Sequence, residues 1–402
     1  MIPEGMRDVL PPEASQLRAL EAALAQRFAA YGFEEVRTPT LEFAETLELA
    51  QDDTLSAGYR LFDEQGRELI VRTDMTVPVA RLAASRFEDR PLPLRLSYAA
   101  LSLRPWAPQR SQDGEFVQAG VELIGLRSAT ADAECVTLLC DALSSLGLRE
   151  FRVALGNVAF YRALVGSLGL DDDDAQALLG ALADRDYPLA ESIAGKADVP
   201  DEARRDLQRA LELSGTGDVL AHARKLASTP DMERAVEHLV RVRQHVDDAG
   251  FGDFLAFDFA LFQDLTYYSD VIFEAYAPGV GQPIATGGRY DGLLARFDWD
   301  VPGVGFAIAV DRLHDALREA HVAPAPAPPA LAFLGGLDEP ARAAELRRAG
   351  WNVACLPADA ATEPPLLRRS GGSYVLQLPG YGRVKGGWRD VVRGLADARG
   401  RA

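Results

Sequence analysis

The chain has 402 residues but only three cysteines, Cys135, Cys140 and Cys355, and none of them forms a Cys-x-x-Cys pair. This shortage excludes a disulfide framework and indicates a reducing compartment. Cys135 and Cys140 lie in an apolar, helix-like run, where a free cysteine packs as a small buried hydrophobe rather than binding a metal. We expect no metal site and no cofactor.

Long apolar segments are also missing. No apolar run approaches the roughly 20 residues that a helix needs to cross a bilayer. The N-terminus also lacks the basic and then apolar pattern of a signal peptide. We therefore expect a cytoplasmic protein with no membrane contact.

Positive charge is scarce, because 42 Lys and Arg residues stand against 60 Asp and Glu residues, a formal net charge of −18. A protein that grips tRNA usually presents a basic stripe, since the neutralisation of phosphates dominates its affinity. The acidic balance argues against such a role, although solubility or an acidic proteome explains it equally well. We expect no nucleic-acid partner.

Helix and strand patterns alternate through the first part of the chain, whose 48% hydrophobic content suits a protein of two or three domains. Apolar spacing predicts an amphipathic helix over residues 14–31, ended by Gly32. A second helix is predicted from about residue 73 through Leu82. Strands are predicted at residues 33–39, 69–72, 94–103 and 115–124.

Helical patterns follow one another from about residue 158 to 250 without a strand signal, which indicates a helical insertion within one domain. Four acids at residues 171–174 precede an apolar periodic stretch there. We interpret them as a helix cap that complements the helix dipole, since a hard-metal site usually takes ligands from more than one segment. Strand patterns return at residues 257–262, 271–276 and 304–310.

A run of Pro and Ala at residues 323–330 predicts an extended linker between a core of residues 1–322 and a tail of residues 331–402. The tail is typical of a small α/β unit of marginal independent stability. We interpret its basic and aromatic segment, residues 383–389, as a turn and a helix start rather than an RNA contact. Strands are predicted at residues 331–333, 351–356 and 374–378, and helices at residues 340–349 and 387–398.

Gln118, Gly120 and Glu122 are two residues apart on a predicted strand, so all three face one side of the sheet. The glycine leaves room for a ligand between the two polar groups. A buried carboxylate with no Lys or Arg nearby in sequence favours a cationic partner, such as the α-ammonium of a free amino acid. On these residues alone, ordinary strand side chains satisfied within the protein remain the simpler interpretation.

Short motifs occur along the chain in a fixed order. Together they resemble the class II aminoacyl-tRNA synthetase core, and its histidine branch in particular, over roughly residues 1–320. The resemblance implies an α+β fold, with an antiparallel sheet flanked by helices, the helical insertion and a truncated anticodon-domain-like C-terminal unit. The motifs span residues 3–8, 32–39, 72–76, 95–125, 285–292 and 305–313.

The resemblance also implies a histidine-binding site. Asp74 stands where the family has a glutamate that reads the ligand's ammonium, and the family assigns tyrosines near residue 267 to the imidazole side. Tyr267 and Tyr268 would point to opposite faces of a strand, so that only one of them normally reaches the ligand. The expected histidine-binding residues are Asp74, Gln118, Glu122, Tyr267, Tyr268, Gly287 and Gly288.

The catalytic half of the motif set departs from the family. Gln263 replaces an arginine that contacts the reacting carboxylate and phosphate, and a neutral amide cannot stabilise charge on a phosphate oxygen. Trp106 replaces a glutamate that helps to read adenine, and the loop at residues 111–114 lacks the expected arginines. Arg104 and Arg312 match phosphate-binding arginines and form a possible phosphate-binding remnant. We expect no catalytic residues.

A kept histidine pocket with eroded adenylation residues resembles the ATP phosphoribosyltransferase regulatory subunit family. That family implies a non-catalytic role in the first step of histidine biosynthesis, with L-histidine as allosteric feedback ligand. It also implies assembly with a short-form catalytic subunit, and motif 1 implies a homodimer within that hetero-oligomer. Two alternatives remain: a divergent histidyl-tRNA synthetase or other class II amino-acid ligase, and a pure scaffold with a vestigial pocket.

Overall fold

A computed structural model describes residues 2–49, 58–104, 114–184, 186–196, 199–261, 268–322 and 331–399. The chain divides into two compact units, residues 1–324 and residues 325–402. The predicted linker at residues 323–330 lies outside the described residues.

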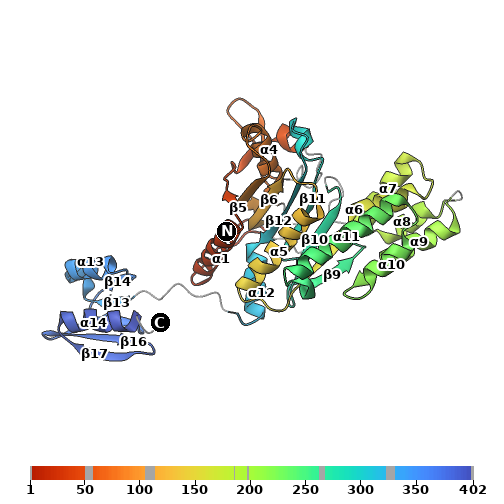
Figure 1. Cartoon of the computed structure of the whole chain (residues 1–402). Helices are drawn as coiled ribbons and strands as arrows, with labels where there is room; N and C mark the ends of the chain where they lie inside the picture. The colour runs from red at the N-terminus through yellow and green to blue at the C-terminus, as the bar shows by residue number, and fades with distance from the viewer. Residues whose placement is uncertain are drawn as a thin grey trace. The chain divides into compact units, whose positions relative to one another are not determined.

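The first unit is built on a nine-stranded sheet (Figure 1). Its six central strands (β5, β6, β12, β11, β10 and β7) pair antiparallel with one another in that order. The pairs β1–β5 and β7–β9 are parallel. The antiparallel sheet flanked by helices is therefore confirmed, with parallel pairing added toward its edges. The strand order is β1 (Glu34–Glu35), β5 (Leu94–Leu103), β6 (Glu115–Ile124), β12 (Gly303–Ala309), β11 (Ala285–Arg289), β10 (Val271–Tyr276), β7 (Arg152–Asn157), β9 (Leu255–Asp258) and β8 (Ser214–Gly215).

Helices cover one face of this sheet. In the first of them, Leu17, Leu20, Leu24 and Phe28 form a buried stripe, as the apolar spacing predicted. Phe28 packs edge-on against Phe306 of β12, with ring centroids 5.9 Å apart. Each fully buried side chain of this kind stabilises the fold by about 1.5–3 kcal/mol. The covering helices are α1 (Glu13–Ala30), α5 (Ala129–Ser145), α11 (Pro230–Asp248) and α12 (Val310–Glu319).

The other face of the sheet packs against a separate, smaller core. Helix α4 (Thr76–Arg86) and the short helix η3 (Leu294–Phe297) contribute some of its apolar side chains, and strand β5 contributes others. A small sheet lies beside it, with strand order β2 (Leu41–Phe43), β4 (Glu68–Val71) and β3 (Arg60–Phe62), and α2 (Ala44–Leu49) follows β2. The predicted ligand-binding residues of β6 face this smaller core.

The helical region holds α6 (Val158–Gly166), α7 (Asp172–Ala183), α8 (Tyr187–Ala194), α9 (Asp201–Leu211) and α10 (Val219–Leu226). The Asp171 carboxylate accepts a hydrogen bond from the backbone N–H of Asp174 at 2.8 Å, which confirms the predicted helix cap. The expectation of no strand here was wrong, because β8 pairs with β9. A strand of two residues has too little alternation to be seen in a sequence. The short helix η2 (Gly252–Phe254) precedes β9.

Strand boundaries in the first unit also differ from the expectations. The strand predicted at residues 33–39 is reduced to β1, which pairs with β5 through two residues only. Strand β11 was not predicted, because Gly287 and Gly288 remove the β-branched and aromatic side chains that mark strands. Residues 94–103 and 115–124 form β5 and β6 with the predicted bounds.

The second unit is a five-stranded sheet whose apolar core includes side chains of two helices. Phe333, Tyr374 and Trp388 form an aromatic cluster in this core. The turn predicted in residues 383–389 is wrong, because most of this segment belongs to strand β17, but the predicted helix start is confirmed at Trp388. The strand order is β14 (Val353–Leu356), β13 (Leu331–Leu334), β15 (Leu366–Ser370), β16 (Ser373–Leu378) and β17 (Gly382–Gly386), and the helices are η4 (Gly336–Asp338), α13 (Pro340–Arg348) and α14 (Trp388–Arg399).

Candidate functional site

Strand β6 places Gln118, Gly120 and Glu122 on one face of the large sheet, because their side chains alternate with those that face α1 and α5. Glu122 pairs with Gly305 of β12, and Gly305 pairs with Gly288 of β11. One row across three strands therefore carries a carboxyl group and two glycines. A side chain at Gly305 would place its Cβ 1.9 Å from Oε2 of Glu122, so this glycine is what makes room for the carboxyl group.

Glu122 is 1% exposed, and hydroxyl groups surround its carboxyl group. Tyr98 donates a hydrogen bond to Oε1 at 3.2 Å, Tyr290 donates to Oε2, and the hydroxyl of Thr76 is a third partner. Burial raises the pKa of Glu122 to about 8; the three hydroxyls lower it, and the charge of Asp74 raises it further. No Lys or Arg in the described part of the chain pairs with this acid.

Asp74 lies between β4 and α4, in a segment that Arg72 anchors. The buried Arg72 guanidinium donates to the backbone carbonyls of Thr38 at 2.9 Å and of Leu101 at 2.7 Å. The Asp74 carboxylate accepts a hydrogen bond from the N–H of Val77 at 3.3 Å, at the start of α4. Asp74 and Glu122 are thus two acids in one neighbourhood, which favours a ligand that brings positive charge.

Gln118 lies on the same face of β6 and is 7% exposed. Ser102 of β5 donates a hydrogen bond to Oε1 of Gln118 at 3.3 Å. This contact leaves the amide N–H₂ group of Gln118 as the group that can donate to a ligand carboxylate, and its oxygen retains a second lone pair for an ammonium.

The glycines have more specific roles than the sequence indicated. A Cβ on Gly120 would meet the carbonyl of Phe306 at 2.2 Å and the hydroxyl of Tyr98 at 2.6 Å, so the protein itself fills the space that we had expected for a ligand. Gly287 faces away from the site and lies under the ring of Phe273. Of the predicted pair, Gly288 alone lies on the site face.

Tyr268 is 8% exposed, and its ring lies against Gly288, where a Cβ would be 2.8 Å from the ring atoms. The structure therefore brings Tyr268, Gly288, Glu122 and Asp74 into one neighbourhood, with Gln118 on the same sheet face. The remaining predicted positions, namely Tyr267, Gln263, Trp106 and residues 111–113, lie outside the described residues.

The two arginines of the predicted phosphate-binding remnant both contact backbone carbonyls. Arg104 donates to the carbonyl of Thr73 at 3.0 Å, and its guanidinium lies 5.1 Å from the ring centroid of Phe116. Arg312, in the first turn of α12, donates to the carbonyl of Pro283 at 3.0 Å. A guanidinium has five N–H donors, so each of these bonds uses only part of one.

Sequence reasoning missed the three hydroxyl donors to Glu122. Tyr98 shares its face of β5 with Leu94 and Leu96 and is typical of a core position. All three donors lie inside motifs that carry the resemblance. A buried acid at Glu122 needs hydrogen-bond partners, and these motifs were the place to look for them.

Two absences concern the described residues. Among them no three His, Cys, Asp or Glu side chains are placed to hold a metal ion. No helix there is both long and apolar enough to cross a bilayer.

The comparison with known proteins adds to this geometry. A family model described as histidyl-tRNA synthetase matches residues 5–313. An ATP phosphoribosyltransferase regulatory subunit from Moorella thermoacetica is 39% identical over 88% of this chain and 91% of its own length. The chain belongs to the ATP phosphoribosyltransferase regulatory subunit family. The members of this family have the histidyl-tRNA synthetase-like fold, and the predicted family relationship is confirmed.

Solved structures agree with this family. A structure named as an ATP phosphoribosyltransferase regulatory subunit/histidyl-tRNA synthetase from Bacillus halodurans matches with a TM-score of 0.79 and 30% identity, covering 90% of this chain and 94% of its own. A histidyl-tRNA synthetase from Nostoc matches with a TM-score of 0.77 at 19% identity over 99% of both chains. The second match shows the shared fold alone.

Proposed function

We propose that this chain is a non-catalytic regulatory subunit of ATP phosphoribosyltransferase that binds L-histidine beside Glu122. The observation that carries the proposal is a buried acid that has hydroxyl donors and no cationic partner among the described residues, close to a second acid, Asp74. Histidine carries positive charge that suits these two acids. It is also the end product of the pathway that the family name implies.

Histidine complements this cluster group by group. Its α-ammonium suits Asp74 and the Oε1 atom of Gln118, and an imidazole N–H suits the carboxyl group of Glu122. The ring of Tyr268 over Gly288 would form one wall of the site. Each charge-assisted hydrogen bond contributes about 1.5–3 kcal/mol. Binding at Glu122 would also displace its proton, since the ionised carboxylate is the stronger acceptor.

The proposed loss of synthetase chemistry rests on Gln263 in the sequence. The related synthetases carry an arginine at this position, and an amide cannot stabilise charge that develops on a phosphate. A histidine-dependent exchange of pyrophosphate into ATP tests this directly. We expect no exchange above background, and robust exchange would favour the alternative of an active ligase.

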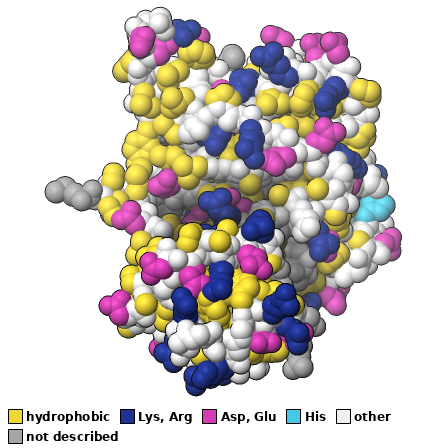
Figure 2. Space-filling view, turned by 90° about the vertical axis from the view of Figure 1, so that its left-hand side faces the viewer, with side chains coloured by type: hydrophobic (Ala, Val, Ile, Leu, Met, Phe, Trp, Pro, Cys, Tyr) yellow, Lys and Arg dark blue, Asp and Glu magenta, His cyan; other side chains and the backbone are white. Residues whose placement is uncertain are grey.

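The proposed assembly includes a short catalytic subunit and a second copy of this chain. The second copy is supported by an exposed apolar face of the small sheet. On this face Leu41, Phe43 and Leu61 are 42%, 40% and 43% exposed, and Leu69 and Val71 lie beside them. Hydrophobic side chains reach the surface in patches between charged ones (Figure 2). An apolar patch of this kind suits a two-fold interface in which the same face packs on itself.

Sedimentation tests the second copy with a matched pair of variants. Leu61→Glu places a charge in the apolar face and should convert a dimer to a monomer. Phe62→Glu places the same charge on the other face of β3, where Phe62 is 71% exposed, and should leave the dimer intact. A monomeric wild-type chain, or dimers with both variants, would contradict this interface.

The regulatory role is tested by co-purification of the chain with the short phosphoribosyltransferase, followed by histidine titration of the complex. We expect the catalytic subunit to need this chain for full activity and to lose activity as histidine saturates the site. Histidine can shift the assembly only by its different affinity for two states, and a coupling of about 1–3 kcal/mol is usual. Full activity with no response to histidine would favour the scaffold alternative.

A further inference from the structure

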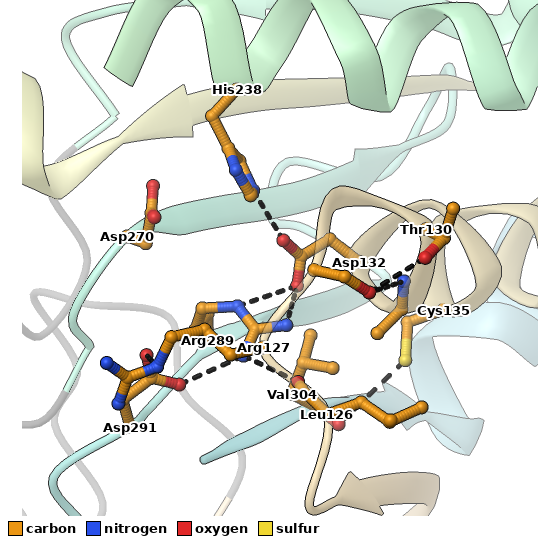
Figure 3. A network of polar contacts seen from close by, with 12 residues as sticks. Leu126, Arg127, Thr130, Asp132, Cys135, His238, Asp270, Arg289, Asp291 and Val304 are labelled. Atoms are coloured by element: carbon orange, nitrogen blue, oxygen red, sulfur yellow. Dashed lines mark hydrogen bonds and ion pairs between the residues drawn. The ribbon is translucent and has the colours of Figure 1, made fainter. Parts of the chain in front are cut away.

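A second polar cluster lies within the first unit, on the opposite face of the sheet from Glu122. Asp132 in the first turn of α5 is 0% exposed and lies between His238 of α11 and Arg289 of β11 (Figure 3). Its Oδ2 atom is 2.5 Å from Nε2 of His238. Its Oδ1 atom accepts hydrogen bonds from Arg289, at 2.9 Å from Nε and 2.5 Å from Nη2.

The cluster is balanced in charge only when His238 is protonated. Arg289 also donates to Oδ1 of Asp291 at 2.9 Å, and Nε of Arg127 lies 3.0 Å from Oδ2 of Asp291. Asp270 faces the same cluster, and Asn157 donates to its carboxylate at 2.5 Å. Three carboxylates then face three cations, which are Arg127, Arg289 and the His238 imidazolium.

The cluster is joined through the backbone to the histidine site. Ser269 donates from its N–H to the carbonyl of Arg289 at 2.7 Å, and its hydroxyl accepts from the N–H of Asp291 at 3.0 Å. Tyr268 directly precedes Ser269 in the chain, and Tyr290 lies between Arg289 and Asp291. The two tyrosines that face the Glu122 site are therefore adjacent to residues that the cluster holds.

We propose that His238 is a positioning residue for the histidine site, which ties helix α11 to the two backbone segments that carry Tyr268 and Tyr290. The proposal rests on the proposed function, because it takes histidine as the ligand of that site. In this proposal, helix α11 transmits a movement of the helical region to the histidine site through His238.

The protonation of His238 supports this role. The charged groups that face it are Asp132 of α5, Asp270 before β10 and Arg289 of β11. Burial opposes its protonation, but the hydrogen bond to Asp132 and the charges of Asp270 and Asp132 outweigh burial and raise the pKa of His238. The ion pair is then complete below this raised pKa and is lost as the pH rises through it, so the positioning effect weakens in the same direction.

Calorimetric titration of the full-length chain with histidine, at several pH values, tests the proposal. We expect His238→Gln to weaken histidine binding by about fivefold or more below the pKa of His238, with a smaller ratio to wild type above it. The control is His245→Gln, the same change at an exposed position of the same helix, which should leave the affinity unchanged. Wild-type affinity at all pH values in a folded His238→Gln chain would overturn the proposal.

A second measurement needs no variant to fold. The chain has five histidines, so selective ¹³C labelling of their rings allows each to be followed by NMR. Coupling is reciprocal, so saturation with unlabelled histidine should raise the pKa of His238 and leave the His245 signal unaffected. If histidine binds and the His238 signal does not respond, the positioning role is wrong. If histidine does not bind the wild-type chain, the proposed function itself has failed.

Discussion

Two buried carboxylates on opposite faces of one sheet differ in what compensates their burial. Asp132 is 0% exposed and contacts two basic side chains, whereas Glu122 is 1% exposed and its hydrogen-bond donors among the described residues are hydroxyls. The first acid is paired with basic side chains that the protein supplies. The second has a pKa raised to about 8, so it keeps its proton at neutral pH until something brings positive charge. The difference separates an acid that holds the fold from the acid beside which we propose that histidine binds.

Replacing each acid by its amide should have different effects: at Asp132 it should lower stability, and at Glu122 it should lower histidine affinity. We expect Asp132→Asn to lower the free energy of unfolding by about 3–5 kcal/mol, because it removes the buried charge that pairs with both Arg289 and His238, while Asp291, the second partner of Arg289, is partly exposed. Urea unfolding followed by circular dichroism measures this. The control is Asp141→Asn on the same helix, whose partner Arg27 is 37% exposed and whose loss should cost below about 1 kcal/mol. Equal losses for both variants would mean that burial of the pair does not matter.

The stability of the chain should depend on pH through Glu122. Its pKa in the folded state is about 8, raised above a usual value of 4.5. The folded state thus favours the protonated acid, so its full contribution to stability is present below pH 4.5 and is lost as the pH rises toward 8. The loss amounts to about 1.4 kcal/mol for each pH unit within that window.

Unfolding measurements at pH 5, 6.5 and 8 on the wild type and on Glu122→Gln isolate this contribution. The difference between the two proteins should change steadily with pH, because glutamine carries no proton to lose. A difference that stays constant from pH 5 to 8 would show that Glu122 is ionised throughout. The same amide substitution at Asp132 serves as the contrast, since Asp132 is paired with cations.

Binding should separate the two acids as clearly as stability does. At neutral pH folding imposes protonation on Glu122 but not on a glutamine, so we expect Glu122→Gln to be no less stable than the wild type. Histidine affinity should nevertheless fall at least tenfold, or about 1.4 kcal/mol, since a charge-assisted bond becomes a neutral one. Calorimetry measures the affinity, and Glu115→Gln at the exposed start of β6 is the matched control. Unchanged affinity in Glu122→Gln would place the histidine site elsewhere.

The sequence predicted one of these clusters better than the other, for a physical reason. Alternation along β6 is local, so Gln118 and Glu122 could be placed on one face from the sequence. The donors to Glu122 come from other segments: Tyr98 from β5, which pairs with β6, Thr76 from α4, and Tyr290 from a position 168 residues away, directly after β11. No periodicity encodes such a contact, and only the resemblance to a family brought the segments together.

The Asp132 cluster was not predicted at all, and neither was β11. Asp132 and Arg289 are 157 residues apart, and each is typical of an exposed position when its neighbours in sequence are the only guide. The bounds of β5 and β6 were right because their side chains alternate over ten residues each. Strand β11 has two glycines among five residues, and their small size matters because the ring of Phe273 packs on Gly287 and the ring of Tyr268 on Gly288.

The smallest expected effect concerns a single donor to Glu122. Tyr98→Phe removes the hydroxyl 3.2 Å from Oε1 but leaves Tyr290 and Thr76 in place, so the carboxyl group keeps two of its three donors. We expect a loss of about 0.5–1.5 kcal/mol in the free energy of unfolding. Because this hydroxyl lowers the pKa of Glu122, its removal should also raise that pKa and weaken histidine binding slightly.

Tyr31→Phe provides the comparison for this last variant. The Tyr31 hydroxyl donates to the carboxylate of Asp141 at 3.0 Å, on the helix-covered side of the sheet. Its loss should cost a similar amount of stability, and histidine affinity measured by calorimetry should stay at the wild-type value. If both variants change stability and neither changes affinity, the hydroxyls around Glu122 only satisfy a buried acid. A change in histidine affinity for Tyr98→Phe but not for Tyr31→Phe would show that the hydroxyls around Glu122 also set how strongly this acid binds a ligand. The two faces of the sheet would then differ in function as well as in packing.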